Sequence, residues 1–285
     1  MTRRRRSLSI PAPQPLELRI VPTVTVNFNA ASGLLKLTGD GASDVVELDS
    51  QGTAGKIIVK VNGAAAGNFN NVKNINAKLG EGNDKLNLKD VNLPGNLIAN
   101  LGGGADQMNF VGVDKIGGLL NANFGSNTGD FVNCQNNTLI VNGDTSFIGV
   151  ADVNLNGNGD SFLDDADDID FKGKLTIRFG ASGDVNSDDY ELFFSNVNVF
   201  GTTLIKGTGR VERLDIGDSS FGGKFTATLA DGNDELDVRT EVVDKNAFAA
   251  AVFFKGGDGN NDVAKIGVNN NFAQDPVVTG FEDIR

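Results

Sequence analysis

The chain has 285 residues, a net charge of −12, 37 glycines, one cysteine and no histidine. The lack of histidine excludes the serine and cysteine mechanisms that rely on a histidine base, and it removes the usual zinc and copper ligand sets. The acidic balance disfavours nucleic acid as a partner, because carboxylates repel phosphate, and it is compatible with binding of cations.

Residues 1–22 hold five arginines and four of the six prolines, without a regular apolar pattern. We expect a disordered basic arm here, followed by one domain over residues 23–285. The arm is either a tether for an anionic surface or a solvated tail. No apolar run of about seven residues follows the arginines, so an ordinary cleaved signal peptide is not predicted. No run reaches the roughly 20 apolar residues of a transmembrane helix.

The stretch from Ile75 to Leu88, INAKLGEGNDKLNL, predicts a strand, a tight turn and a second strand. Apolar residues alternate with polar ones on both sides of Gly80-Glu81-Gly82-Asn83-Asp84, which is typical of half-buried strands. Glycines permit a positive φ in such a turn, and Asn and Asp favour it by bonding to nearby backbone.

Similar units recur along the chain, and the aspartates that close their turns are spaced by 22 to 45 residues. These aspartates are Asp44, Asp84, Asp106, Asp130, Asp160, Asp189, Asp234 and Asp262. The two longest gaps hold degenerate turns at residues 62–67 and 207–210, which gives ten turns with a mean spacing of about 24 residues. That period suits one coil of a parallel β-helix better than a propeller blade of about 40 residues. We therefore predict an all-β, right-handed parallel β-helix of about ten coils.

The turn aspartates have two interpretations. A carboxylate can cap its own turn by accepting backbone N–H bonds. It can also bind calcium, which takes six to eight oxygen ligands from carboxylates and carbonyls. Stacked coils would bring successive turns to about 4.8 Å from each other, so that one ion could lie between two of them.

The turns LGEGNDKLNL, LGGGADQMNF, LADGNDELDV and GGDGNND resemble the hemolysin-type calcium-binding (RTX) nonapeptide, G-G-x-G-x-D-x-(apolar)-x. That family forms β-rolls with calcium between turns and is exported by bacteria. RTX arrays repeat every nine residues, whereas this unit returns every 22 or more, so the chain is more similar to RTX-like solenoids of bacterial surface proteins. LELRIVP also resembles a short motif near the start of some bacterial extracellular proteins.

The resemblance places the calcium-binding aspartates at Asp84, Asp106, Asp234 and Asp262, with a looser match at Asp44, Asp130 and Asp160. It places carbonyl donors at Glu81, Gly103 and Asp231. The pair Asp84 and Asp106, which no insertion separates, is the first candidate.

Two other functions stay open. A parallel β-helix can be a polysaccharide lyase or hydrolase, and the acidic run of residues 164–170 is the candidate catalytic cluster. The chain has one tyrosine and no tryptophan to line a sugar-binding groove, so we interpret this run as a solvated turn or an extra cation site. A metal-free adhesive scaffold is the other alternative, with outward asparagines in ladders at Asn76, Asn100, Asn121, Asn123 and Asn154. We expect a non-enzymatic, extracellular or cell-surface bacterial protein, with calcium and surface or matrix components as partners.

Overall fold

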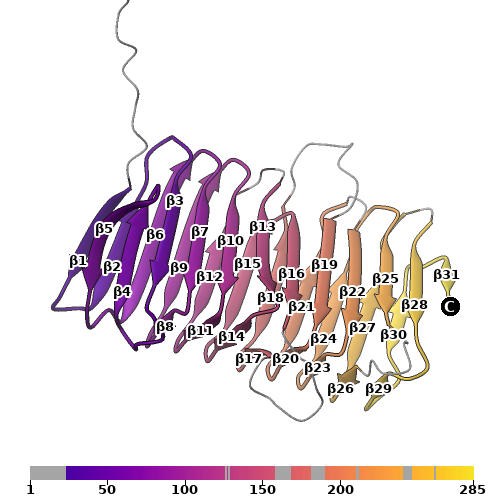
Figure 1. Ribbon diagram of the computed structural model, residues 1–285. Coiled ribbons are helices and arrows are strands. Elements are labelled where there is room, and N and C mark those ends of the chain that lie inside the picture. The colour runs from indigo at the N-terminus through magenta and orange to yellow at the C-terminus, as the bar shows by residue number, and fades with distance from the viewer. Residues whose placement is uncertain are drawn as a thin grey trace, which may run out of the picture.

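The computed structural model describes residues 24–125, 127, 129–157, 168–180, 190–209, 212–239, 246–259 and 261–285. The regular structure in these ranges is β-strand, and the strands wind into a parallel β-solenoid (Figure 1). The predicted all-β class and solenoid architecture are therefore confirmed. The described residues contain no helix long and apolar enough to cross a membrane. The expected arm over residues 1–22 lies outside the described ranges.

Each coil adds one strand to each of three sheets, in a fixed order. The first sheet consists of β1 (Thr25–Asn29), β2 (Leu34–Thr38), β6 (Asn74–Glu81), β9 (Leu97–Gly103), β12 (Leu120–Asn123), β15 (Thr145–Val150), β18 (Leu175–Phe179), β21 (Thr203–Lys206), β24 (Phe225–Thr228), β27 (Val252–Lys255) and β30 (Val277–Thr279). The second sheet consists of β5 (Ala64–Phe69), β4 (Ile57–Val61), β3 (Val45–Asp49), β7 (Lys85–Lys89), β10 (Gln107–Val111), β13 (Phe131–Gln135), β16 (Asp152–Asn156), β19 (Tyr190–Ser195), β22 (Glu212–Gly217), β25 (Glu235–Val238), β28 (Val263–Ile266) and β31 (Asp283–Ile284). The third sheet consists of β8 (Asn92–Leu93), β11 (Val113–Ile116), β14 (Thr138–Val141), β17 (Ile169–Phe171), β20 (Val197–Val199), β23 (Ser220–Phe221), β26 (Ala247–Phe248) and β29 (Asn271–Phe272).

The solenoid makes about seven turns, so the expected ten is an overcount. Seven steps lead from β8 to β29 in the third sheet, and these steps mark the complete coils. Among the described residues, the first level has no strand in the third sheet, because the β4–β5 hairpin follows β3 there, and the last strand of the third sheet is β29.

The core is a set of inward rows that run along the solenoid, because parallel pairing in register puts equivalent side chains one above another. Aromatic side chains dominate its C-terminal half: the rings of Phe221 and Phe248 stack at 5.1 Å, and those of Phe248 and Phe272 at 4.8 Å. Each coil thus buries an apolar face that it could not bury alone.

Antiparallel strands close the N-terminal end of the solenoid. β1 pairs with β2, while β4 and β5 form a hairpin that extends the second sheet from β3. The degenerate turn expected at residues 62–67 is the turn and first part of this hairpin, not a coil. Phe28 of β1 and Phe69 of β5 meet at 5.4 Å and cover the end of the core.

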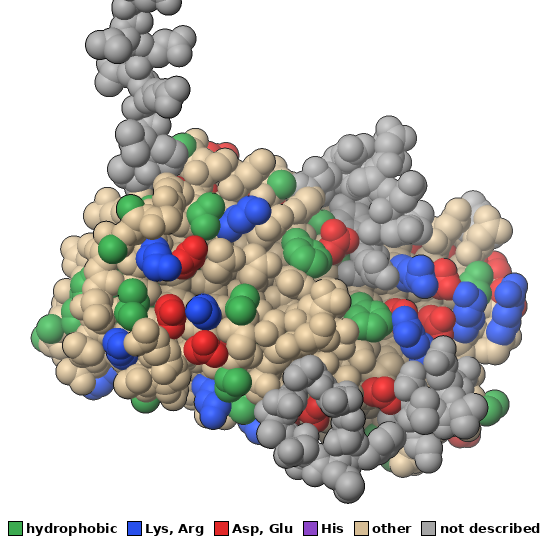
Figure 2. Space-filling model, viewed as in Figure 1, with side chains coloured by type: hydrophobic (Ala, Val, Ile, Leu, Met, Phe, Trp, Pro, Cys, Tyr) green, Lys and Arg blue, Asp and Glu red, His purple; other side chains and the backbone are tan. Residues whose placement is uncertain are grey.

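The polar ladder on the outer surface differs from the expected one. Asn76 is level with Ile98, so the row of the first sheet is interrupted there, and only Asn100 and Asn123 are direct neighbours. The longer row of asparagines is on the second sheet, at Asn87, Asn109, Asn133 and Asn154. Asn109 donates to the side-chain oxygen of Asn87 at 2.9 Å. Figure 2 shows that basic and acidic side chains are mixed at the C-terminal end of the face it presents.

Candidate functional site

The turns between the first and second sheets stack into one corner of the solenoid. Their glycines are needed where adjacent coils approach most closely. Gly80 and Gly102 both have φ of +112°, and a Cβ on Gly102 would lie 1.7 Å from the carbonyl oxygen of Gly80. Because no side chain fits between the two turns, the backbones can stack and place the following aspartates in register.

Those aspartates belong to what we call the carboxylate ladder, a row of acidic residues at the start of the second-sheet strands, just before the strand or, at Glu212, as its first residue. Strand register defines its N-terminal run as Asp44, Asp84, Asp106 and Asp130. The C-terminal run consists of Glu212, Asp234, Asp262 and Glu282. The sequence-predicted sites Asp44, Asp84, Asp106 and Asp130 are thus brought together, as are Asp234 and Asp262.

Except at Asp44 and Glu212, which begin the two runs, each ladder carboxylate accepts a hydrogen bond from the backbone of the coil before it. The backbone N–H of Asp44 donates to Oδ1 of Asp84, that of Asp84 to Asp106, and that of Asp106 to Asp130, each at 2.8 Å. In the C-terminal run, the N–H groups of Glu212 and Asp234 donate to Oδ1 of the next aspartate, also at 2.8 Å. The expected local cap is found at two ladder residues: the N–H of Gly257 donates to Oδ2 of Asp262 at 3.2 Å, and that of Thr208 donates to Oε1 of Glu212 at 2.6 Å. The bonds between neighbouring coils are a further role that the sequence did not predict.

In the part of the chain that the structure describes, the second carboxylate oxygen of five ladder aspartates has no hydrogen-bond partner. This oxygen, Oδ2, is fully buried at Asp44, Asp84, Asp106, Asp130 and Asp234. Burying a carboxylate oxygen without a hydrogen-bond donor costs free energy. The oxygen therefore becomes protonated or binds a cation, or the folded state is less stable.

Burial raises the pKa of these groups. The pKa is raised to about 6 at Asp84 and Asp106, and to about 7 at Asp130 and Asp234. The backbone N–H bonds act in the opposite direction, and neighbouring carboxylates add to the rise. A column of like charges one coil apart therefore favours either protons or a cation.

The expected carbonyl donors lie at the outer rim of this corner. Glu81 and Asp231 are exposed, and Gly103 is half-buried and level with Glu81. The carbonyl oxygen of Gly103 accepts the N–H of Gly82 at 2.7 Å. The charge of Glu81 contributes to the raised pKa of Asp106, so the two carboxylates are close enough to interact.

The ladder is interrupted in the middle of the solenoid. Register puts Ala151 and Tyr190 at the two levels between the runs. In the unit expected at residues 151–164, the first strand was predicted to lie in the first sheet, before the turn. The structure puts that strand, β16, in the second sheet, after the ladder position. Asp160 and Asp189 lie outside the described residues.

The N-terminal run ends on an asparagine from the hairpin. Nδ2 of Asn62 donates to Oδ1 of Asp44 at 3.0 Å, and Oδ1 of Asn62 accepts the N–H of Val45 at 2.8 Å. Asn62 thus takes the position that a ladder residue of a preceding coil would have, which explains why its turn resembles a degenerate repeat.

Three buried acids were missed by the sequence interpretation: Glu212, Asp114 and Asp215, which pairs with Arg239. Glu212 takes a ladder position, and only the phase of the strand after it could have revealed this. Asp114, at the corner between the second and third sheets, accepts the N–H groups of Val91 at 2.7 Å and Val111 at 3.1 Å. Burial raises the pKa of Asp114 to about 7. In the sequence, the only sign of its burial is that it takes an inward position in the alternating strand Val113–Ile116.

The acidic run offers less than the ladder. Residues 164–167 lie outside the described ranges, and the two described members, Asp168 and Asp170, both accept from Nδ2 of Asn198. Asp170 is also paired with Lys172 at 2.5 Å. In the part of the chain that the structure describes, no three acidic, cysteine or histidine side chains converge on one point that could hold a metal ion.

No family model, curated protein or solved structure matches this chain. What can be said about function therefore depends on the ladder itself.

Proposed function

We propose that the protein is a non-enzymatic structural solenoid that binds calcium along its carboxylate ladder. The unpartnered Oδ2 atoms are the observation that carries this proposal. They fit a hard cation, because calcium is bound by oxygen and tolerates irregular geometry. An ion would also offset the like charges of neighbouring levels.

Asp84 and Asp106 would hold the first ion, one oxygen from each level, with Glu81 nearby at the rim. Since no third acid converges with them, backbone carbonyls and water would have to complete the six to eight ligands. Binding at one level should therefore be weak, and the stabilising effect should come from several levels together.

A structural role is supported by how the acids are held. All ladder carboxylates except that of Glu282, at the C-terminal end, are buried, and those of the N-terminal run accept backbone N–H groups, so a substrate could reach these only by breaking the stack. A surface hollow of about 380 Å³ is lined by Asp49, Asp90 and lysines, yet both carboxylates accept backbone N–H groups there. The extracellular or cell-surface location, with surface or matrix components as partners, rests on the resemblance to RTX repeats.

The test is a thermal melt followed by circular dichroism at pH 8, in chelator, in millimolar calcium and in millimolar magnesium. Binding to the folded state alone adds about 2.7 kcal/mol at a hundredfold excess over Kd, which for a chain of this size is a rise in Tm of about 5 °C. The rise should vanish at pH 5, where protons occupy the ladder.

The double variant Asp84→Ala/Asp106→Ala should lose part of the calcium response, whereas Asp231→Ala, an exposed acid in an equivalent turn, should keep it. A melt that is indifferent to calcium at pH 8 would contradict the proposal and make the protein a metal-free scaffold.

A further inference from the structure

The outer surface of the first sheet differs in charge from the rest of this acidic chain. Its strands carry five basic side chains and one acidic residue, Glu81, which lies at the end of β6. The basic residues are Lys36, Lys78, Arg178, Lys206 and Lys255. The whole chain has a net charge of −12, so this sheet is basic although the protein is acidic.

Three of these cations form one row over the C-terminal half of the solenoid. Arg178 of β18 is level with Lys206 of β21, which is level with Thr228 of β24, and Thr228 is level with Lys255 of β27. Consecutive levels are about 4.8 Å apart, so the three charges lie along a line parallel to the solenoid axis. All three side chains are exposed.

Two more lysines flank this row. Lys174 and Lys224 precede β18 and β24 and are also exposed. Nζ of Lys224 lies 4.4 Å from the ring centroid of Phe253, which is half-buried in the outer face of β27. We call Lys174, Arg178, Lys206, Lys224 and Lys255 the basic face.

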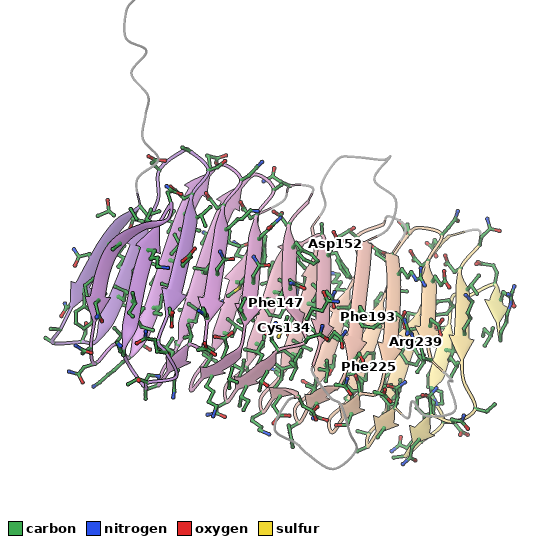
Figure 3. All side chains as sticks on the ribbon, viewed as in Figure 1. Cys134, Phe147, Asp152, Phe193, Phe225 and Arg239 are labelled. Atoms are coloured by element: carbon green, nitrogen blue, oxygen red, sulfur yellow. The ribbon has the colours of Figure 1, made fainter. Side chains whose placement is uncertain are left out.

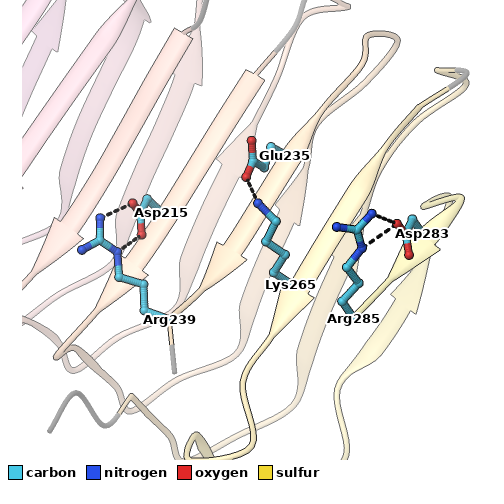
Figure 4. A network of polar contacts seen from close by, with 6 residues as sticks. All are labelled: Asp215, Glu235, Arg239, Lys265, Asp283 and Arg285. Carbon is cyan, nitrogen blue, oxygen red and sulfur yellow. Dashed lines mark hydrogen bonds and ion pairs between the residues drawn. The ribbon is translucent and has the colours of Figure 1, made fainter. Parts of the chain in front are cut away.

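The basic face lacks the internal compensation that is found on the second sheet. There, Arg239, Lys265 and Arg285 each pair with a carboxylate, Asp215, Glu235 and Asp283 respectively (Figure 4). Within the described ranges, no member of the basic face has an ion-pair partner. Five unneutralised cations on one flat sheet are suited to an external polyanion.

We infer that the basic face binds an extended acidic polysaccharide, whose carboxylates contact Arg178, Lys206 and Lys255 in turn. Hydroxyl groups lie between these cations, at Thr176, Thr202, Thr226 and Thr228, and can hydrogen-bond to sugar hydroxyls. The flat surface accommodates a linear chain without a cleft. This inference concerns a different surface from the ladder and does not depend on calcium.

Nucleic acid fits this face less well. A duplex carries two phosphates at every base-pair step, so the net charge of the protein repels it more strongly than a single polymer chain with one carboxylate per sugar. Single strands are also held by stacking on aromatic platforms. In the described strands β18, β21, β24 and β27, the one outward aromatic ring is that of Phe253, and Lys224 covers it.

The experiment measures binding of fluorescent polygalacturonate to the full chain by anisotropy, in chelator so that calcium cannot bridge. The triple variant Arg178→Gln/Lys206→Gln/Lys255→Gln should bind about tenfold more weakly or worse, since three surface ion pairs are lost. The matched variant Lys85→Gln/Lys89→Gln/Lys115→Gln, with the same change in charge on the other two sheets, should bind like the wild type. High salt should abolish binding. The single variant Arg178→Lys should retain it.

Neutral dextran and a thymidine oligonucleotide of equal charge complete the test. Equal losses in the two triple variants would show a general effect of net charge and overturn the inference. Tighter binding of the oligonucleotide would assign the face to nucleic acid, and no binding of polygalacturonate at low salt would also overturn it. Circular dichroism melts of both triple variants check that each is folded.

Discussion

Oδ1 of Asp106 accepts the backbone N–H of Asp84, 22 residues earlier, at 2.8 Å. The same bond recurs one level up and one level down, so each carboxylate replaces a backbone acceptor that the turn cannot supply. The aspartate of the repeat thus joins neighbouring coils through Oδ1, while Oδ2 of Asp84, Asp106 and Asp130 has no hydrogen-bond partner among the described residues.

Asp106→Ala should lower the free energy of unfolding by about 1–3 kcal/mol at pH 5, because the N–H of Asp84 loses its acceptor in a buried place. Asp106→Asn keeps an oxygen in the same position and should cost less than about 1 kcal/mol. Urea unfolding measures both, with the exposed Asp231→Ala as control. Equal costs for alanine and asparagine would contradict the role of the carboxylate as an acceptor.

In chelator, the protein should become less stable as the pH rises from about 4 to about 7. The pKa of Asp84 and Asp106 is raised to about 6, and that of Asp130 and Asp234 to about 7, above the value near 3.9 of an unfolded aspartate. In this window the folded chain binds more protons than the unfolded chain, so the free energy of unfolding falls with pH.

Melts at pH 4.5, 6 and 7.5 test this dependence on pH. The variant Asp84→Asn/Asp106→Asn should show a shallower slope. A stability that increases steadily across this range would mean that the ladder carboxylates are ionised in the folded chain without cost.

Gly102→Ala should destabilise the protein by several kcal/mol. The new Cβ would lie 1.7 Å from the carbonyl oxygen of Gly80, and φ of +112° is unfavourable for alanine. Gly41→Ala is the matched control in an equivalent turn, because no atom lies within 4 Å of its Cβ position and its φ is not in the positive range. It should be neutral or stabilise slightly, and similar costs for both would show that the turns can separate.

The sequence predicted the solenoid because alternation and a period of about 24 residues both depend on local chemistry that recurs. The prediction from the sequence was wrong at the levels that depart from the repeat. Asn62 resembles a coil turn because it makes the bonds of a ladder residue from a hairpin. The break at Ala151 was missed because the spacing to the next Gly-x-Gly-Asp looked regular, although β16 had already entered the second sheet. Register between coils depends on pairing partners about 20 residues away, which a local pattern does not specify.

Arg239 marks the one place on the second sheet where a surface ion pair should matter for stability. It binds Asp215 through two nitrogens, and its guanidinium lies over the ring of Phe193 at 5.0 Å (Figure 3). Asp215 is buried, and its neighbour Asp237 has a raised pKa because of burial and of the charge of Asp215. Without Arg239, Asp215 would lose its ion-pair partner, and Asp237 would keep the charge of Lys265 but lose that of Arg239.

Arg239→Met keeps the stem over Phe193 and removes the charge, so we expect a loss of about 1–3 kcal/mol at pH 8. The loss should be smaller at pH 4 than at pH 8, because the neighbouring Asp237, whose pKa is raised by burial and by the charge of Asp215, then carries less negative charge. Lys60→Met breaks the exposed pair with Glu47 and should cost less than about 1 kcal/mol. Urea unfolding of both variants at the two pH values measures the difference; equal and small costs would mean that solvent screens Asp215 despite its burial.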